Sequence, residues 1–582
     1  MARKVRNGIL YVLGAVIICA TLYHLFLYDG ATISAVSYHV NPSPTIQSNS
    51  FSTSAAINAI HENLTASIPP HVGPLVTPSL VASRSVSTTS ILLPGWEVLV
   101  IVSPEDTKLL ESDSDEYECL FNTNEVSPAK SAGFLPFPNR ATFKCVLPVR
   151  IRQRRPFKQP ILKKLLANQP EKNYPPLLLL WTFIVYDSLT TENDVILFVK
   201  GVNNRQGTNR DPKEFRCVFG NGVINGVKTP VTASMQEVFR CQRPEPTAVS
   251  AVGQQIDVSI EIIAENRVVP SVAYYTPPRS LEKGPQKSLL CACTMVYNMA
   301  KFLKEWVMYH SKIGVEKFLL YDNGSDDNLT KVVEELVKEG FDVKTYFWFW
   351  PKTQEAGFSH SSVYAKNACT WMIFIDVDEF VYSPSWHRSP RPSKSMLQSL
   401  ISPEKVSTKL KLGQYSINCH EFGPSNQRTH PVMGVTQGYN CRRKYENRHK
   451  SVTLLSAVDD SLINAIHHFG LRPGYKTRKL RTKDMVVNHY KYQAWPEFKV
   501  KFRRRVSAYV LDWTKKVNPK SKDRTPGLGF SPTEPNGWHQ KFCEVHDDEL
   551  KELTRKWFGN KSRLGFQMPW QMTTTNNGFH KP

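Results

Sequence analysis

The chain has 582 residues, of which 41% are hydrophobic, and it carries a formal net charge of +22. This composition is typical of a globular protein with roughly two or three domains. The basic excess predicts partners that carry phosphate or acidic groups, or a membrane surface. Nucleic acid would be a common partner for such a charge, but the N-terminal segment argues against it.

An apolar run at residues 8–28 is about the length of a membrane-spanning helix. Arg3, Lys4 and Arg6 precede it, so the positive-inside rule places residues 1–7 in the cytosol and the rest across the membrane. A cleaved signal peptide is the alternative, but no small-residue cleavage site closes the run. We therefore expect a single-pass type II membrane protein, with residues 29–90 as a flexible stem rich in Ser, Thr, Pro, Ala and Asn.

The cysteine pattern fits an oxidising lumen on the far side of that membrane. None of the cysteine spacings is a CxxC pair, which disfavours a zinc ribbon. Local spacing suggests the disulfides Cys217–Cys241 and Cys419–Cys441, although spacing alone does not determine connectivity. Sequons for N-glycosylation occur at Asn63, Asn323, Asn328 and Asn560.

Residues 91–275 contain short β-type runs that are separated by Gly, Pro and Asn. Apart from a short basic stretch at 161–166, no run with helical spacing interrupts them. This pattern predicts an all-β sandwich domain. Its large aromatic residues, such as Trp181 and Tyr186, are either core residues or exposed platforms for sugar rings.

After a linker at 277–285, strands alternate with helices. The alternation predicts an α/β domain over residues 286–570, with a mostly parallel sheet covered by helices on both faces. Expected strands are 288–296, 317–321, 343–349 and 371–375, and expected helices are 302–313 and 329–337. Ligands of such sheets bind beyond the carboxyl ends of the strands, so residues 294–298, 322–327 and 376–378 should share one edge.

The stretch WMIFIDVDEFVY, at 371–382, carries the strongest chemical signal. Its apolar residues lead directly into Asp376 and Asp378, which is typical of a buried strand that ends at a charged site. Two carboxylates so close together can hold Mg²⁺ or Mn²⁺, which is most useful where a diphosphate leaves. His489, directly after an apolar strand, is the candidate third ligand. The alternatives are a solvated acidic turn and a core histidine.

A reaction in which a diphosphate leaves also needs a base for the attacking group and contacts to the molecule that carries the diphosphate. Glu421 is the first candidate base, and Asp460 with its neighbour Asp459 is the second, unless that pair is a solvated loop. Lys450 is a candidate contact to the diphosphate. Candidate contacts to the rest of that molecule are Thr294, Val296, Asn298, Asp322 and Asn323, followed by Gln354, His360 and Asn367. The second strand end also resembles a helix start, at which Ser325 or Asp326 would be the N-cap.

The segment CTMVYNMAKFLKEWVMYHSKIGVEKFLLYDNGSDDN, at 293–328, together with WMIFIDVDEF resembles glycosyltransferase family 92. The matching motifs cover roughly residues 287–492, about a third of the chain. Together with a signal anchor and a β-rich N-terminal domain, they look like the plant enzymes that synthesise β-1,4-galactan. Members commonly carry an acidic residue where this chain has Met299.

The resemblance implies a GT-A fold, UDP-galactose as the donor, Mn²⁺ and inversion at the anomeric carbon. It also implies extension of β-1,4-galactan side chains of pectin at the non-reducing end, in the Golgi. Further implications are that the β-rich domain is a carbohydrate-binding module and that the enzyme forms a homodimer.

Two alternatives come from other functional classes. A phosphohydrolase of the haloacid dehalogenase type has an acidic motif that FIDVD resembles, with the first Asp as nucleophile. That family places Thr or Val where this chain has Glu379, and here two strand–helix units precede the motif. A membrane-anchored glycan-binding protein without activity is the second alternative.

Overall fold

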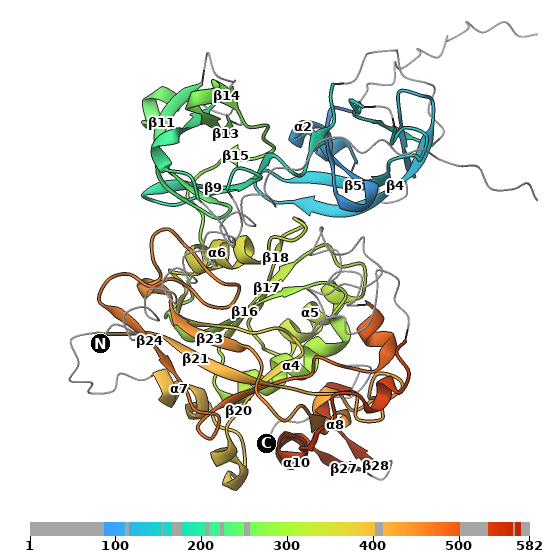
Figure 1. Cartoon of the computed structure of the whole chain (residues 1–582), viewed down its shortest axis with the longest axis vertical. Coiled ribbons are helices and arrows are strands. Elements are labelled where there is room, and N and C mark those ends of the chain that lie inside the picture. Colours follow the sequence, from blue (N-terminus) through green and yellow to red (C-terminus); the bar gives the residue numbers. More distant parts are fainter. Residues whose placement is uncertain are drawn as a thin grey trace, which may run out of the picture. The chain divides into compact units, whose positions relative to one another are not determined.

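A computed structural model describes residues 86–110, 116–153, 155–165, 176–203, 209–220, 226–249, 256–401, 411–500, 534–562 and 565–571 (Figure 1). The predicted cytosolic tail, membrane anchor and almost all of the predicted stem lie outside these ranges. Among the residues within them, no helix has the length and apolar character needed to span a bilayer.

The first sheet has seven strands in the order β6-β3-β4-β5-β2-β1-β7. It encloses a hydrophobic cluster of its own, which includes Val98, Val100 and Phe143, and the Cys119–Cys145 disulfide joins β3 to β5. The elements are β1 (Thr88–Leu92), β2 (Glu97–Val102), the short helix α2 (Pro104–Thr107), β3 (Tyr117–Leu120), β4 (Val126–Leu135), β5 (Arg140–Val146), β6 (Ile161–Lys164) and β7 (Leu179–Leu180).

The second sheet has eight strands in the order β14-β13-β10-β11-β12-β9-β8, with β15 paired to β13. Its cluster includes Val185, Phe215 and Ile260. The Cys217–Cys241 disulfide lies within it, as predicted. The strands are β8 (Ile184–Thr190), β9 (Asp194–Lys200), β10 (Phe215–Phe219), β11 (Val227–Met235), β12 (Val238–Gln242), β13 (Ile256–Ile262), β14 (Arg267–Val268) and β15 (Tyr274–Tyr275).

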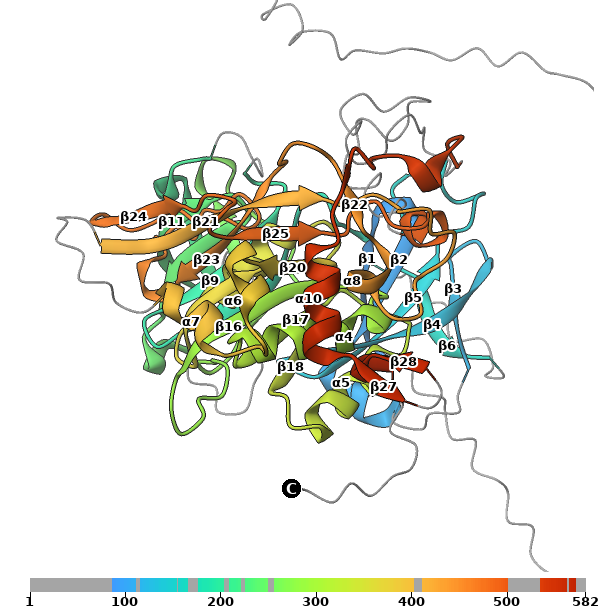
Figure 2. The same cartoon turned by 90° about the horizontal axis from the view of Figure 1, so that it is seen from below.

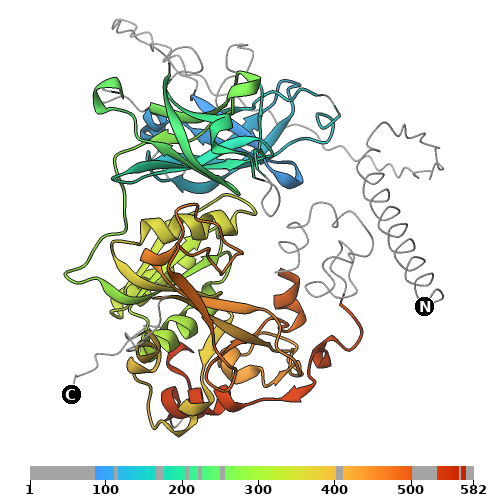
Figure 3. The same ribbon diagram turned by 60° about the vertical axis from the view of Figure 1, so that its left-hand side comes forward.

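The described residues of this N-terminal half are mainly strands and turns (Figure 3, blue to green). In the predicted sandwich, two facing sheets would share one core. Here each of the two sheets has a cluster of its own, and residues of both sheets, such as Leu99 and Ile196, are also buried together in a third cluster. We therefore call the two sheets the first and the second β unit.

The third sheet has nine strands in the order β18-β17-β16-β19-β23-β21-β25-β20, with β24 paired to β21. The prediction of a mostly parallel sheet holds for β16 to β19, which are mutually parallel. Beyond β19 the sheet is mixed, because β23 is antiparallel to both of its neighbours and β20 is antiparallel to β25. The strands are β16 (Ser288–Val296), β17 (Lys317–Asp322), β18 (Val343–Phe347), β19 (Cys369–Phe374), β20 (Glu379–Tyr382), β21 (Lys411–Glu421), β23 (His449–Leu454), β24 (Tyr475–Lys479) and β25 (Val486–His489).

Helices cover this sheet, and the two predicted ones are observed as α4 and α5. Apolar residues of α4, such as Phe302, Leu303 and Val307, are buried in a cluster with β16, β17 and β19. Near the C-terminus α10 packs against α8 (Figure 2). The helices are α4 (Ala300–Ile313), α5 (Leu329–Lys338), α6 (Gln354–Tyr364), α7 (Ser395–Ile401), α8 (Val435–Gly438) and α10 (Glu549–Phe558); the two-stranded sheets pair β22 (Cys441–Arg442) with β26 (Val545–His546) and β27 (Asn560–Ser562) with β28 (Gly565–Gln567).

The predicted Cys419–Cys441 disulfide is wrong. Cys441 bonds to Cys543, because the pairing of β22 with β26 brings the two cysteines together. Cys419 is a buried free thiol in β21. A further disulfide, Cys291–Cys369, joins the neighbouring strands β16 and β19.

An aromatic cluster joins the second β unit to the third sheet. Trp181 and Tyr186 are buried in the same cluster as Trp348 and Trp350, so the core interpretation of the first two residues is confirmed. The rings of Trp181 and Trp350 stack with centroids 5.8 Å apart. The indole N–H of Trp350 also donates a hydrogen bond of 2.8 Å to the carboxylate of Asp187. Burial raises the pKa of Asp187, and this bond opposes the shift.

We expect Trp350→Phe to lower the free energy of unfolding by about 1–3 kcal/mol, because the Asp187 carboxylate loses a buried donor. Trp570→Phe is the matched control, since its indole N–H bonds to the Met433 carbonyl at an exposed site. Chemical denaturation of both variants measures the difference. An equal loss in the two variants would contradict a special role for the Asp187 bond.

Candidate functional site

The site is built on the turn between β19 and β20. Residues Met372 to Ile375 are fully buried, and the chain then turns at Asp376. The side chain of Glu379 closes this turn by accepting a hydrogen bond of 2.8 Å from the Asp376 N–H. The Glu379 N–H donates to the Asp376 carbonyl at 3.0 Å. The predicted strand that runs into a charged turn is therefore observed.

Helix α4 fixes the start of β20 through side chains that the sequence showed only as an apolar stripe. The Trp306 indole N–H donates to the Glu379 carbonyl at 3.1 Å, and the Tyr309 hydroxyl donates to the Val381 carbonyl at 2.7 Å. His310 accepts from the Val381 N–H at 3.4 Å. Burial lowers the pKa of His310 to about 3, so the ring is neutral and can accept. The backbone of β20 is thus held at its first and third residues.

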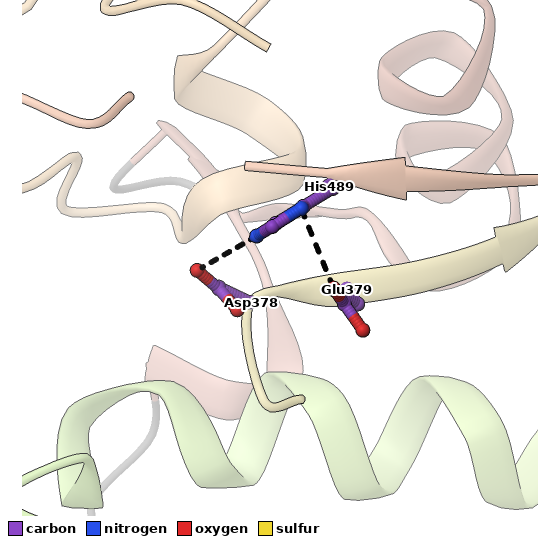
Figure 4. A group of neighbouring side chains, drawn as sticks. All are labelled: Asp378, Glu379 and His489. Atoms are coloured by element: carbon purple, nitrogen blue, oxygen red, sulfur yellow. Dashed lines mark ion pairs between the residues drawn. The ribbon is translucent and has the colours of Figure 1, made fainter. Parts of the chain in front are cut away.

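Three buried side chains meet at the start of β20 (Figure 4). The ligand-type atoms of Asp378, Glu379 and His489 all lie within 4.8 Å of one another. His489 Nε2 lies 3.7 Å from Asp378 Oδ2, and His489 Nδ1 lies 3.4 Å from Glu379 Oε1. The strand register explains this placement, because Glu379 and His489 are opposite each other in β20 and β25. Among the described residues, His489 Nδ1 has no hydrogen-bond partner although it is buried.

Lys450 brings positive charge into this cluster. Its ammonium group lies 3.0 Å from Asp376 Oδ2, 2.7 Å from Glu379 Oε1 and 2.6 Å from His467 Nε2. Burial alone would lower the pKa of Lys450, but the carboxylates of Asp376 and Glu379 raise it above its ordinary value. Burial lowers the pKa of His467, so its neutral ring can accept from the ammonium group.

The charge balance of the cluster favours a divalent cation. Asp376, Asp378 and Glu379 supply three carboxylates, against the single ammonium group of Lys450. Burial opposes ionisation of Asp376, yet Lys450 holds its pKa below the ordinary value. Carboxylate oxygens with one imidazole form a donor set that suits Mn²⁺. The residues present therefore fit such an ion.

The predicted metal ligands are distributed over two sides of the turn. Asp378 and His489 are in the three-residue group, whereas Asp376 contacts Lys450 and has a side chain that is 31% exposed. Glu379 was missed as a site residue by the sequence argument, although it directly follows the two predicted acids. Lys450, predicted as a diphosphate contact, lies inside the cluster.

Of the two candidate bases, Glu421 lies next to the cluster. It is opposite His489 in the pairing of β21 with β25, and its side chain is fully buried. Glu421 Oε1 lies 2.6 Å from the ammonium group of Lys491. Burial opposes ionisation of Glu421, but Lys491 lowers its pKa, so it remains a carboxylate.

Asp460 has a different environment. Its side chain is 69% exposed and pairs with Arg472 at 2.5 Å and with Arg240 at 3.6 Å. Its neighbour Asp459 accepts hydrogen bonds from the N–H and the hydroxyl of Ser461. The ion pairs of Asp460 and the hydrogen bonds of Asp459 are typical of a solvated loop, which was the alternative interpretation of these two residues.

The first two strand ends lie side by side, as the edge rule predicts. Asn298 has a left-handed backbone (φ 51°), and its N–H donates to the Ser325 hydroxyl at 3.1 Å. Asp322 accepts from the Ser325 N–H at 2.9 Å. The Asn323 amide donates to the carbonyls of Trp348 and Trp350, so it ties β17 to the chain after β18.

The predicted helix cap and the remaining candidate residues of this edge have the following environments. Helix α5 has Asn328 as its N-cap, without a side-chain hydrogen bond, so the capping prediction for Ser325 or Asp326 is wrong. Thr294 and Val296 are buried in β16. Of the lower-ranked candidates, Gln354 donates to Asp376 at 3.5 Å, His360 is a core residue hydrogen-bonded to Tyr321, and Asn367 is exposed.

Comparison with known proteins gives the same family by two routes, a family profile and individual relatives. The profile of glycosyltransferase family 92 matches residues 286–524. A family 92 protein of Arabidopsis thaliana is 40% identical over 425 residues, which cover 71% of this chain and 72% of the relative. The galactan beta-1,4-galactosyltransferase GALS2 of the same plant is 28% identical over 146 residues, or 23% of this chain and 27% of the relative.

Among solved structures, the mannosyltransferase PcManGT from Pyrobaculum calidifontis, crystallised with GDP-Man and Mn²⁺, matches with a TM-score of 0.23 and 10% identity. The match covers 42% of this chain and 70% of that protein. The TM-score is low, and the function proposed below does not depend on it.

We expect Lys450→Met to lower the free energy of unfolding by about 3–5 kcal/mol, because the buried Glu379 and the partly exposed Asp376 lose their counter-charge. Added Mn²⁺ should recover part of this loss by supplying positive charge. Lys317→Met is the control: Lys317 is also buried, but its partner Asp342 is 42% exposed. The control should lose about 1 kcal/mol or less and should not respond to Mn²⁺. Thermal denaturation with and without the ion makes the comparison, and equal behaviour would contradict the charge balance described above.

Proposed function

The chain belongs to glycosyltransferase family 92, and we propose that it transfers a sugar from a nucleotide-sugar donor to a glycan with the help of a divalent cation. The observation that carries the proposal is the buried pair of Asp378 and His489 at the start of β20. Their facing atoms are 3.7 Å apart, and His489 is fixed by its position opposite Glu379.

We assign Asp376, Asp378 and His489 as the residues that hold Mn²⁺. Ligating histidines commonly direct their second ring nitrogen to a carboxylate, which fixes the orientation of the ring. Glu379 is placed for this role, since its Oε1 lies 3.4 Å from His489 Nδ1. When bound, the cation supplies positive charge that offsets the charge on the departing diphosphate.

The other steps belong to side chains of the chain itself. Lys450 lowers the pKa of Asp376 and opposes the rise that burial causes in the pKa of Glu379. We propose that it also contacts the diphosphate. Glu421 is the proposed base, because it is an ionised carboxylate one strand away from His489. It would accept the proton of the acceptor hydroxyl as the new glycosidic bond forms. Asp460 remains the second candidate.

For the substrates we propose UDP-galactose and the non-reducing end of β-1,4-galactan, with inversion at the anomeric carbon. Support comes from the motif resemblance and from the match to the Arabidopsis galactan beta-1,4-galactosyltransferase. The proposed contacts to the uridine are Thr294, Val296, Asn298, Asp322 and Asn323, at the first two strand ends. The hydroxyl of Thr294 supports this assignment, because it is buried without a hydrogen bond among the described residues.

Several wider features belong to the same proposal. We propose a GT-A fold for residues 286–570 and a carbohydrate-binding role for the two β units. We also propose a single-pass type II Golgi membrane protein that forms a homodimer and acts on pectin side chains. The phosphohydrolase alternative is not favoured, since Asp376, its nucleophile, is held in an ion pair with Lys450.

We expect the full-length protein to extend a galacto-oligosaccharide with UDP-galactose and Mn²⁺, and to lose the activity in excess chelator. Asp378→Asn should lower the rate at least 100-fold, by roughly the magnitude expected for lost electrostatic stabilisation of the leaving group. Asp484→Asn is the control, because this exposed residue forms an ion pair with Arg481. Product analysis across a panel of sugar nucleotides identifies the donor. Full activity in chelator would contradict the cation assignment.

The two candidate bases can be separated by replacing each one. Glu421→Gln should lower kcat by about 10²–10⁴ while UDP binding, measured by calorimetry, is retained. Asp460→Asn should leave kcat within about twofold of the parent value, because an exposed ion pair contributes little. If Asp460→Asn lowers kcat by about 10²–10⁴ and Glu421→Gln does not, Asp460 is the base.

A further inference from the structure

The hairpin between β11 and β12 reaches from the second β unit into the α/β part of the chain. Gln236 lies at its turn, with a left-handed backbone (φ 55°) and a side chain that is largely buried. Its amide donates to the carbonyl of Asn464 at 2.8 Å and accepts from the N–H of the same residue at 3.2 Å. One side chain therefore satisfies both backbone groups of Asn464.

Asn464 in turn holds helix α6. Its side-chain amide donates to the Glu355 carbonyl at 3.0 Å and to the Ser359 hydroxyl at 2.8 Å. The Ser359 hydroxyl donates to the Leu462 carbonyl at 3.0 Å. The segment 459–469 is thus fixed between the hairpin and α6.

Both elements held by Asn464 contact the acidic cluster. His467, three residues further along the segment, lies 2.6 Å from the ammonium group of Lys450 and 3.7 Å from Asp376. Gln354, the first residue of α6, donates to Asp376 at 3.5 Å. Gln236 is therefore connected to Asp376 by two routes, one along segment 459–469 to His467 and one through α6 to Gln354.

The contact between the β11–β12 hairpin and α6 contains little free space. A cavity of about 10 Å³ lies between the hairpin and α6, lined by Gln236, Glu237, Thr353 and Ser359 among others. Close-packed interiors transmit displacements because few voids can absorb them. A second link strengthens the contact, since Arg240 of β12 donates to the Asp460 carbonyl at 2.7 Å.

We propose that Gln236 is a positioning residue for the active site: it holds segment 459–469 so that His467 sets the places of Lys450 and Asp376. The second β unit would then be required for catalysis itself, in addition to any role in glycan binding. This inference rests on the proposed function only where it names the cation and the UDP moiety as the ligands of the cluster.

The test uses the full-length chain with Gln236→Ala and the matched control Gln242→Ala, an exposed glutamine on the same hairpin. The probes are Mn²⁺ alone, followed by electron paramagnetic resonance, and UDP with Mn²⁺, followed by calorimetry. These readouts do not require sugar transfer, so they remain informative if the proposed substrates are wrong. We expect Gln236→Ala to weaken Mn²⁺ binding and to lower kcat, each by about tenfold, with Gln242→Ala within about twofold of the parent. Unchanged Mn²⁺ affinity and kcat would overturn the inference.

A double-mutant cycle tests the route. If Gln236 acts through His467, replacing Gln236 in a His467→Ala background should cost about twofold or less. The same tenfold cost in both backgrounds would indicate a general structural role and overturn the inference. Gln236→Glu serves where the alanine variant does not fold, because it keeps the size of the side chain and an acceptor for the Asn464 N–H but replaces the amide donor with a carboxyl group. It should give an intermediate loss of Mn²⁺ affinity, and full affinity would also overturn the inference.

Discussion

The contact of Lys450 with Asp376 and Glu379 is the interaction on which the site depends. Three carboxylates within one short turn, of which those of Asp378 and Glu379 are buried, would repel one another strongly without a positive charge. Lys450 supplies that charge from β23, a strand placed beside β19 by the antiparallel half of the sheet. The mixed topology is therefore a functional requirement, since a continued parallel sheet would give β23 the opposite direction and present other residues at this edge.

Three independent elements immobilise the acidic turn around that contact. Helix α4 holds the backbone of β20, β25 supplies His489 opposite Glu379, and segment 459–469 presents His467 to Lys450. Each element arrives from a distant part of the chain. A cation site needs ligands that keep their positions when the ion and the substrate exchange. Here α4 anchors the backbone of β20, whereas β25 and segment 459–469 place the side chains around the turn.

Local patterns predicted the parts of the fold that local physics determines. The apolar run before Asp376, the helical spacing in α4 and α5, and the placement of strand ends at one edge all follow from periodicity and from the geometry of parallel sheets. His489 was found because it directly follows an apolar strand. Long-range pairing was beyond this reasoning: the partner of Cys441, the antiparallel β23 and the separate clusters of the two β units depend on contacts between distant segments. Glu379 was missed because its role appears only when β25 places His489 opposite it.

The shared aromatic cluster bears on how such proteins diversify. Residues 286–524, which match the family profile, bury Trp348 and Trp350 against side chains such as Tyr186 that lie outside that region. A recombination event that exchanged the N-terminal half for an unrelated module would leave these indoles facing water. Inheritance of the two halves as a single cooperative unit is the expected evolutionary outcome, and new specificities would then arise by point substitution in loops more readily than by domain shuffling.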